Sequence, residues 1–240
     1  MKYSNKLRVP FSQTGVSDGI SVIGAAQIIE DSVCAFFAAF GKDNATLKKE
    51  YGALWVFVKN KFQRRAFTTW NEEITVESYL TVKTAATVVV DTAVKNSEGE
   101  IAVAARTELC VVDLGNKRIR RISSVDFPEN IAVYDSVFGF EFNRFELTRL
   151  EKKYGFTVPS TSIDLCGHLN NVEYLRFVLN ATSAETEIFR PVREIEINFV
   201  AQACEGEKLT LFGGECGANE FFEIKSGEMS VARCRVFRGG

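Results

Sequence analysis

The feature that most constrains the fold is a weak internal repetition between the two halves of the chain. Each half has a short extended segment, a heavily apolar helical stretch, and then four stretches rich in β-branched residues. Residues 7–11 and 156–159 correspond in place and character, which gives an offset of about 150 residues. A helix that is apolar on nearly every side needs a sheet to cover it. The repetition therefore predicts an α+β chain built from two copies of one strand–buried helix–four-strand antiparallel unit.

Two helical stretches and two sets of strands carry this repetition. The helices are predicted at 21–40, with Gly41 as the stop, and at 171–181. Residues 96–99 are predicted to form a hairpin turn. The strands are predicted at 55–65, 73–82, 87–94 and 101–112 in the first half, and at 194–203, 208–215, 221–225 and 229–237 in the second.

The segment between the two repeats is predicted to be a linker. The N-terminal repeat is placed at 1–122, the linker at 123–154 and the C-terminal repeat at 155–240. The linker carries the mixed charges and the proline, Pro128, that are typical of a connection. Residues 147–153 could form a short helix within it.

Composition limits the class of protein. With 240 residues, 46% of them hydrophobic and 25% charged, the chain is expected to be a soluble globular protein with a substantial core. No apolar run reaches the length of a membrane span and no signal peptide precedes the first repeat, so a cytoplasmic location is expected. The net charge of −2 argues against bulk nucleic-acid binding. Six cysteines without a CxxC pair favour reduced thiols over disulfides or a zinc site, and no cofactor is expected.

The most reactive stretch of the chain is Ser162–Tyr174, which holds the single histidine, His168. Imidazole titrates near neutrality, and the carboxylate of Asp164 could orient it or shift its pKa. Asn170 followed by Glu173 is typical of a helix N-cap with a capping-box acid. The helix would then begin just after His168 and direct its first N–H groups back toward it. Those groups could stabilise a developing oxyanion.

The string Asp-x-x-Gly-His-x-Asn-Asn-x-x-Tyr at 164–174 resembles the signature of the bacterial and plant acyl-[acyl carrier protein] thioesterases. The similarity continues in the first half at 55–58, at Thr69–Trp70 and at 109–114. The resemblance implies a tandem (double) hotdog fold, in which the first repeat shapes the acyl pocket and the second carries catalysis. It also implies hydrolysis of fatty acyl-[acyl carrier protein] thioesters to free fatty acid and carrier protein, as part of fatty acid biosynthesis.

Carried over to this chain, the family's functional aspartate and histidine fall on Asp164 and His168. Two positions depart from the family pattern: Cys166 stands where asparagine is usual, and Gln202 stands where glutamate is usual. Glutamine cannot take a proton from water, but its amide oxygen can orient one. We therefore assign His168 as the general base, Asp164 as the group that orients His168 or the water, and Gln202 as a water positioner.

Other residues have two readings each. Cys166 lies near the histidine and a helix start, so a thiol nucleophile is the alternative to water attack. The backbone N–H groups of Asn170 and Asn171 are assigned to the oxyanion, with helix capping alone as the alternative. Trp55 and Phe57 are assigned to the acyl pocket, although aromatic residues of this kind also fill protein cores.

An acidic carrier protein is the expected partner. It could dock on the basic run 117–121 and on 59–65, unless these cations are solvated strand edges. A homodimer is left open. Two other functions remain as alternatives: an acyl-thioester hydratase or dehydratase, and a non-catalytic module that binds acyl groups or carrier proteins.

Overall fold

The computed structural model describes residues 1–16, 19–136, 138–144 and 149–239. The chain forms two compact units, Met1–Phe140 and Glu141–Gly240. Within the described ranges, no helix is long and apolar enough to cross a membrane.

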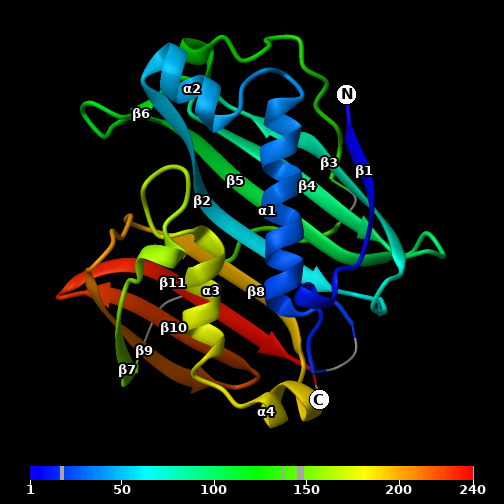
Figure 1. Cartoon of the computed structure of the whole chain (residues 1–240), viewed down its shortest axis with the longest axis vertical. Helices are drawn as coiled ribbons and strands as arrows, with labels where there is room; N and C mark the ends of the chain where they lie inside the picture. Colours follow the sequence, from blue (N-terminus) through cyan, green and yellow to red (C-terminus); the bar gives the residue numbers. More distant parts are fainter. Residues whose placement is uncertain (17–18, 137, 145–148, 240) are drawn as a thin grey trace. The chain divides into compact units, whose positions relative to one another are not determined.

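The first unit is built on an antiparallel sheet (Figure 1). Its strands are β1 (Tyr3–Arg8), β2 (Ala53–Arg64), β3 (Glu73–Lys83), β4 (Thr87–Lys95), β5 (Ile101–Asp113) and β6 (Ile119–Arg120). The sheet order is β1-β3-β4-β5-β2, and β6 pairs with β5. The strands and the hairpin turn predicted for the first half are confirmed.

A long helix, α1 (Val22–Ala38), covers one face of this sheet and contacts β1, β3 and β4 (Figure 1). The Oγ of Ser21 caps its first turn by accepting the N–H of Gly24 at 2.9 Å. Large side chains such as Phe36 are fully buried between the helix and the sheet. Gly41 adopts left-handed backbone with φ +65° just after the helix ends. The helix predicted at 21–40 is therefore confirmed.

A short helix that the sequence pattern missed, α2 (Asn44–Tyr51), follows α1. Asp43 caps it by accepting the N–H of Thr46 at 3.0 Å, and Gly52 ends it in left-handed backbone with φ +58°. Both end signals are visible in the sequence. The stretch between them is short and mostly polar, so it has no apolar periodicity to mark it as a helix.

The second unit repeats the plan of the first. Its elements are β7 (Glu151–Thr157), α3 (Asn171–Leu179), α4 (Ala184–Phe189), β8 (Val192–Phe199), β9 (Lys208–Cys216), β10 (Asn219–Ser226) and β11 (Met229–Arg238). The sheet order is β7-β9-β10-β11-β8. Counted from the first strand of each unit, this is the order found in the first unit, with the main helix again after the first strand. The prediction of two copies of one unit is confirmed.

The main helix of the second unit packs on its sheet through aromatic side chains. Phe177 of α3 stacks on Phe156 of β7 with ring centroids 3.6 Å apart. Tyr174 meets Phe199 of β8 edge to face at 5.6 Å. Val172, Leu175 and Val178 are also buried on this side of the helix. The helix predicted at 171–181 is confirmed. It is about two turns shorter than α1, because its apolar face is shorter.

Several boundaries differ from the sequence prediction. Residues 151–153, expected in a short helix, belong to β7, because pairing with β9 decides their conformation; residues 147–148 lie outside the described part. The strand predicted at 194–203 ends at Phe199, where the N–H groups of Val200 and Ala201 both donate to the carbonyl of Val231 and the chain turns away.

The predicted linker, 123–154, is divided between the two units. Its first part packs on the first unit: Lys83 donates to the carbonyl of Pro128 at 2.6 Å, and Ser136 donates to Asp91 at 2.5 Å. Asp91 is itself paired with Arg106 at 3.0 Å on the face of the sheet opposite α1. These contacts explain why the boundary falls at Phe140 rather than near residue 122.

Candidate active site

A tight loop, Ile163–Leu169, precedes α3 and carries the predicted acid–base pair. It follows a 3-10 turn, η3 (Ser160–Ser162), and its two ends form an isolated antiparallel bridge. The N–H of Asp164 donates to the carbonyl of His168 at 2.9 Å, and the N–H of Gly167 donates to the carbonyl of Asp164 at 3.0 Å. Gly167 has φ +83°, a conformation that favours glycine. Short-range hydrogen bonds thus join the backbone of Asp164 to that of His168.

The Asp164 side chain stabilises the loop from within. Its Oδ1 accepts the N–H of Cys166 at 2.8 Å, the pattern of an Asx turn. Asp164 and His168 are both half-buried, and the Nδ1 atom of His168 is fully shielded from solvent. Cys166 is half-buried in the same turn. The loop therefore gathers a carboxylate, an imidazole and a thiol, three groups that can take part in acyl transfer.

The start of α3 is capped by Asn170, as predicted. The Oδ1 of Asn170 accepts the N–H of Val172 at 2.8 Å. The N–H of Asn170 donates to the carbonyl of Ser162 at 2.9 Å, whereas the Glu173 carboxylate accepts from Arg176 at 3.1 Å. The Asn170 N–H thus has a backbone partner in this structure, and its oxyanion role stays a prediction. The oxyanion role of Asn171, the first residue of α3, stays a prediction.

Gln202 lies in the turn after β8, and its side chain is exposed. The next residue ties this turn to the site. The carbonyl of Ala203 accepts the N–H of Leu169 at 2.8 Å, and the N–H of Ala203 donates to the Tyr174 hydroxyl at 3.1 Å. Gln202 and His168 are therefore the direct chain neighbours of two residues, Ala203 and Leu169, that are hydrogen-bonded to each other. Its predicted role as a water positioner is not tested by these contacts.

Tyr174 is a residue of the motif to which the sequence gave no role. It is almost fully buried, and burial raises the pKa of its phenol well above the ordinary value. The phenol therefore stays neutral and its oxygen can accept the Ala203 N–H. Tyr174 acts as a support that fixes the turn carrying Gln202 against α3. The position of Tyr174 in the motif was the only sequence signal that this residue matters. Its role could not be predicted, because its partner, the Ala203 N–H, is far along the chain.

Trp55 and Phe57 belong to β2 of the first unit, and both are buried. Trp55 stacks on Phe37 of α1 with ring centroids 4.3 Å apart, and its indole N–H donates to the carbonyl of Lys42 at 2.8 Å. Phe127 meets the same indole edge to face at 5.5 Å. These contacts place Trp55 on the α1 face of the sheet, inside the core of its own unit.

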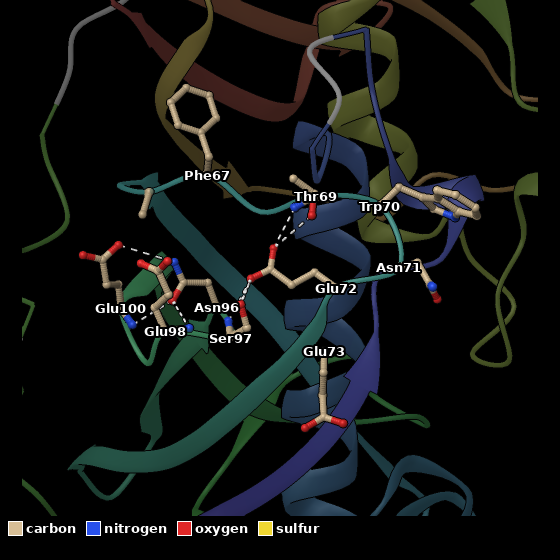
Figure 2. Close-up of a pocket in the computed structure, with 11 residues that line it drawn as sticks. Phe67, Thr69, Trp70, Asn71, Glu72, Glu73, Asn96, Ser97, Glu98 and Glu100 are labelled. Atoms are coloured by element: carbon tan, nitrogen blue, oxygen red, sulfur yellow. Dashed lines mark hydrogen bonds between the residues drawn. The ribbon is translucent and has the colours of Figure 1, made fainter.

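A separate open pocket of about 770 Å³ lies in the first unit between residues 66–73 and the hairpin turn 96–100 (Figure 2). Figure 2 shows Glu72 between Thr69 and Ser97, and it accepts hydrogen bonds from the backbone N–H of each, at 2.7 and 2.8 Å. Burial raises the pKa of Glu72, but the hydrogen bonds from Ser97 and Thr69 outweigh it and hold the pKa below its ordinary value. Glu72 is thus a structural tie between two loops.

The two predicted basic regions differ in the structure. Around 59–65, Lys61 is only 3% exposed, Lys59 pairs with Glu108 at 3.0 Å, and Arg65 donates to the carbonyl of Phe138 at 2.6 Å. Lys61 is thus built into the fold, whereas Arg65 remains exposed. Among residues 117–121, the exposed cations are Lys117, Arg118 and Arg121.

Within the described residues, no group of three or more His, Cys, Asp or Glu side chains is placed to hold a metal ion.

Two copies of a helix-on-sheet unit define a hotdog protein, and an aspartate and a histidine lie in the loop before the main helix of its second unit. Residues 1–130 match the acyl-ACP thioesterase N-terminal domain, and residues 146–229 match the acyl-ACP thioesterase C-terminal domain. The chain therefore belongs to the acyl-ACP thioesterase family. It is a thioester hydrolase that acts on fatty acyl-ACP.

Solved structures agree on the fold. An acyl-ACP thioesterase from Bacteroides thetaiotaomicron superposes with a TM-score of 0.89 at 17% identity, over 99% of this chain and 98% of that one. The 12:0-ACP thioesterase from Umbellularia californica superposes with a TM-score of 0.82 at 14% identity, over 99% and 97% of the two chains. The fold is thus the double hotdog. A search of curated proteins finds no match.

Proposed function

We propose that the loop Ile163–Leu169 is the centre at which this thioesterase releases free fatty acid by direct attack of water. The observation that carries the proposal is the loop itself, which holds Asp164 and His168 together immediately before the capped start of α3. His168 takes a proton from water as the water oxygen bonds to the thioester carbonyl carbon. The tetrahedral oxyanion then collapses, the C–S bond breaks, and the carrier thiol leaves with that proton.

The neighbouring residues are given supporting roles in this proposal. Asp164 orients His168 or the attacking water, and the Asn171 N–H at the start of α3 stabilises the oxyanion. Gln202 orients the water through its amide oxygen. Cys166 is not the nucleophile, because attack by a thiol on a thioester only produces another thioester and gains little driving force.

The first unit is proposed to hold the acyl chain. Trp55 and Phe57 line the α1 face of β2, where apolar side chains are gathered and water is excluded. A chain of methylene groups gains about 0.8 kcal/mol for each group moved from water into such surroundings. This gain anchors the substrate while the chemistry takes place at the thioester.

The carrier protein is proposed to dock on exposed cations of the first unit. Lys48 and Lys49 lie in the last turn of α2, and the cations of 117–121 lie beside it, because Leu114 donates to the carbonyl of Gly52 at 2.9 Å. Acidic carrier proteins would be steered toward this surface, and the association rate should fall as salt screens it. A cytoplasmic location, predicted from composition, is part of the proposal.

The test is an assay with a panel of acyl-carrier proteins in which free thiol, free fatty acid and hydrated product are followed together. The proposal expects thiol and fatty acid in equal amounts and no hydrated product. Hydration of an enoyl chain without thiol release would identify a hydratase. Tight binding with no product of either kind would identify a non-catalytic module.

A further inference from the structure

The α1 face of the first sheet carries polar side chains as well as apolar ones. Ser78 of β3 and Thr92 of β4 are directly paired, and their hydroxyl oxygens are 2.7 Å apart. Ser32 of α1 approaches Ser78 at 2.8 Å. This contact shows that Ser78 and Thr92 face α1. The three hydroxyl groups form a hydrogen-bonded chain from Ser32 through Ser78 to Thr92. Each of them has a partner, so none needs a further ligand.

Strand register places two more polar residues on the same face. Thr92 pairs with Ala105 of β5, so Thr107, two residues further along, also faces α1. Asn60 of β2 is directly opposite Thr107, and paired residues of an antiparallel sheet share a face. Phe57 is opposite Leu109, the next residue of β5 on this face. Asn60 and Thr107 therefore lie beside the aromatic residue proposed to contact the acyl chain.

These two residues, unlike the hydroxyl chain, are left without partners. The Oδ1 of Asn60 and the Oγ1 of Thr107 are buried, and neither has a hydrogen-bond partner among the described residues. Burial of one unpaired polar group is unfavourable, and two on directly opposed residues are a specific cost to the fold. Asn60 keeps 6% of its surface exposed and Thr107 keeps none, so a ligand would reach the pair from the Asn60 side.

We propose that Asn60 and Thr107 form a binding site for a hydroxyl group carried on the acyl chain of the substrate. A hydroxyl group can donate to the Asn60 Oδ1 and accept from the Thr107 hydroxyl at the same time. A methylene group would leave both atoms unpaired, and a keto oxygen, which only accepts, would satisfy one of them. The inference rests on the proposed function in one respect, namely that the first unit holds the acyl chain.

The experiment uses acyl-carrier proteins of one chain length that carry a single hydroxyl group, moved stepwise along the chain. At one position, kcat/KM should exceed that of the unsubstituted chain by about tenfold, as expected for one newly satisfied hydrogen-bonding site. A hydroxyl group elsewhere should lower kcat/KM, because it is desolvated without a partner. If no position is preferred over the unsubstituted chain, the proposal is overturned and the pair only holds a buried water.

Isosteric variants assign the effect to these side chains. Thr107→Val and Asn60→Leu should each abolish the preference, measured as the ratio of the hydroxylated to the unsubstituted substrate, so that general losses cancel. Thr107→Ser should retain it, because the hydroxyl group stays. Thr75→Val is the matched control, since Thr75 lies on the opposite face of β3. A preference that survives both Thr107→Val and Asn60→Leu would exclude the pair as its source.

A binding measurement separates this inference from the proposed hydrolysis. Free fatty acids with the same series of hydroxyl positions can be titrated into the whole protein by calorimetry. Tighter binding at one position, lost in Thr107→Val, supports the site even if no thioester is cleaved. Hydrolysis of unsubstituted chains, with no hydroxyl preference in binding or turnover, would leave the proposed function intact and overturn the site.

Discussion

The loops before the two main helices have matching hydrogen bonds at their ends, and the aspartate and histidine of the second loop correspond to glycines in the first. In the first unit, Thr14 bridges Ile20, and the N–H of Gly15 donates to the carbonyl of Gly19 at 3.0 Å. In the second unit, Ile163 bridges Leu169, and the N–H of Asp164 donates to the carbonyl of His168 at 2.9 Å. The cap residues also correspond: Ser21 donates to the carbonyl of Gln13 and Asn170 to that of Ser162, both at 2.9 Å.

The difference lies in what projects from this shared backbone. Glycine 15 of the first unit stands in the place of Asp164, and Gly19 stands in the place of His168. A side chain at Gly19 is excluded, because its Cβ would lie 2.4 Å from the carbonyl oxygen of Thr68. The comparison teaches that the backbone hydrogen bonds at the loop ends start the helix in both units. Only the second loop has room for a side chain at the position that corresponds to Gly19.

The largest effect is expected when the second loop loses its imidazole. His168→Ala should lower kcat by about 10²–10⁴-fold, as removal of a general base usually does. Circular dichroism and the melting temperature should remain close to those of the parent, because the loop is held by backbone hydrogen bonds. A folded His168→Ala protein with parental turnover would remove His168 from the mechanism.

A smaller loss of activity is expected at Asp164, where charge and loop structure can be separated. Asp164→Asn keeps an oxygen for the Cys166 N–H but removes the charge, so activity should fall by about 10²-fold while stability is kept. Asp164→Ala should lose similar activity and also about 1 kcal/mol of unfolding free energy. Chemical denaturation and steady-state kinetics on both variants measure the two effects. Parental activity in Asp164→Asn would show that the carboxylate only builds the loop.

The first loop should respond in stability alone. Gly19→Ala introduces a Cβ against the Thr68 carbonyl and should cost about 1–3 kcal/mol of unfolding free energy, as overpacking does. Hydrolysis per folded molecule should not change. Urea unfolding combined with kinetics below the transition checks both statements. An unchanged stability would mean that the first loop is less tightly packed than its contacts indicate.

The helix caps offer a matched pair. Ser21→Ala and Asn170→Ala each remove one side-chain cap and should each cost about 1 kcal/mol of stability. Only Asn170→Ala should also lower kcat, because it loosens the helix start beside His168. Equal effects of the two substitutions on kcat would contradict the statement that only the second loop takes part in catalysis.

The smallest effects are expected at the two positions that depart from the family pattern. Cys166→Ala should retain most activity, and Cys166→Asn should be neutral or beneficial because it adds a donor near the oxyanion. Gln202→Glu should alter the pH profile by adding a titrating group. Intact-mass measurement during turnover should show no acyl adduct. Loss of activity in Cys166→Ala together with an adduct on the parent would establish covalent catalysis instead.

Apolar periodicity explains what could be predicted from the sequence. The helix at 21–40 and the strands of the first half carry patterns strong enough to place them within a few residues, and the Asp164–His168 motif lies on a loop whose hydrogen bonds are local. The helix α2 has no such pattern. The end of β8 depends on the distant carbonyl of Val231, and local spacing cannot reveal it.

The site could be predicted only as far as its local contacts reach. Asn170 was identified as a cap because its partner is two residues away. Its N–H, by contrast, is taken by Ser162, and the turn that carries Gln202 is fixed by Tyr174 through a backbone amide nearly thirty residues away. Contacts across that separation form only in the folded unit, so neither the Ser162 partner of the Asn170 N–H nor the supporting role of Tyr174 could be predicted from the sequence.

The central claim is tested most directly by giving the second loop the glycines of the first. The double variant Asp164→Gly, His168→Gly should fold and should bind acyl-carrier protein, because the backbone hydrogen bonds of the loop are those already made by Gly15 and Gly19. Its kcat should fall to about the level of His168→Ala alone, because the two side chains act together. A double variant that still hydrolyses acyl-carrier protein at more than about a tenth of the parental rate would contradict the account.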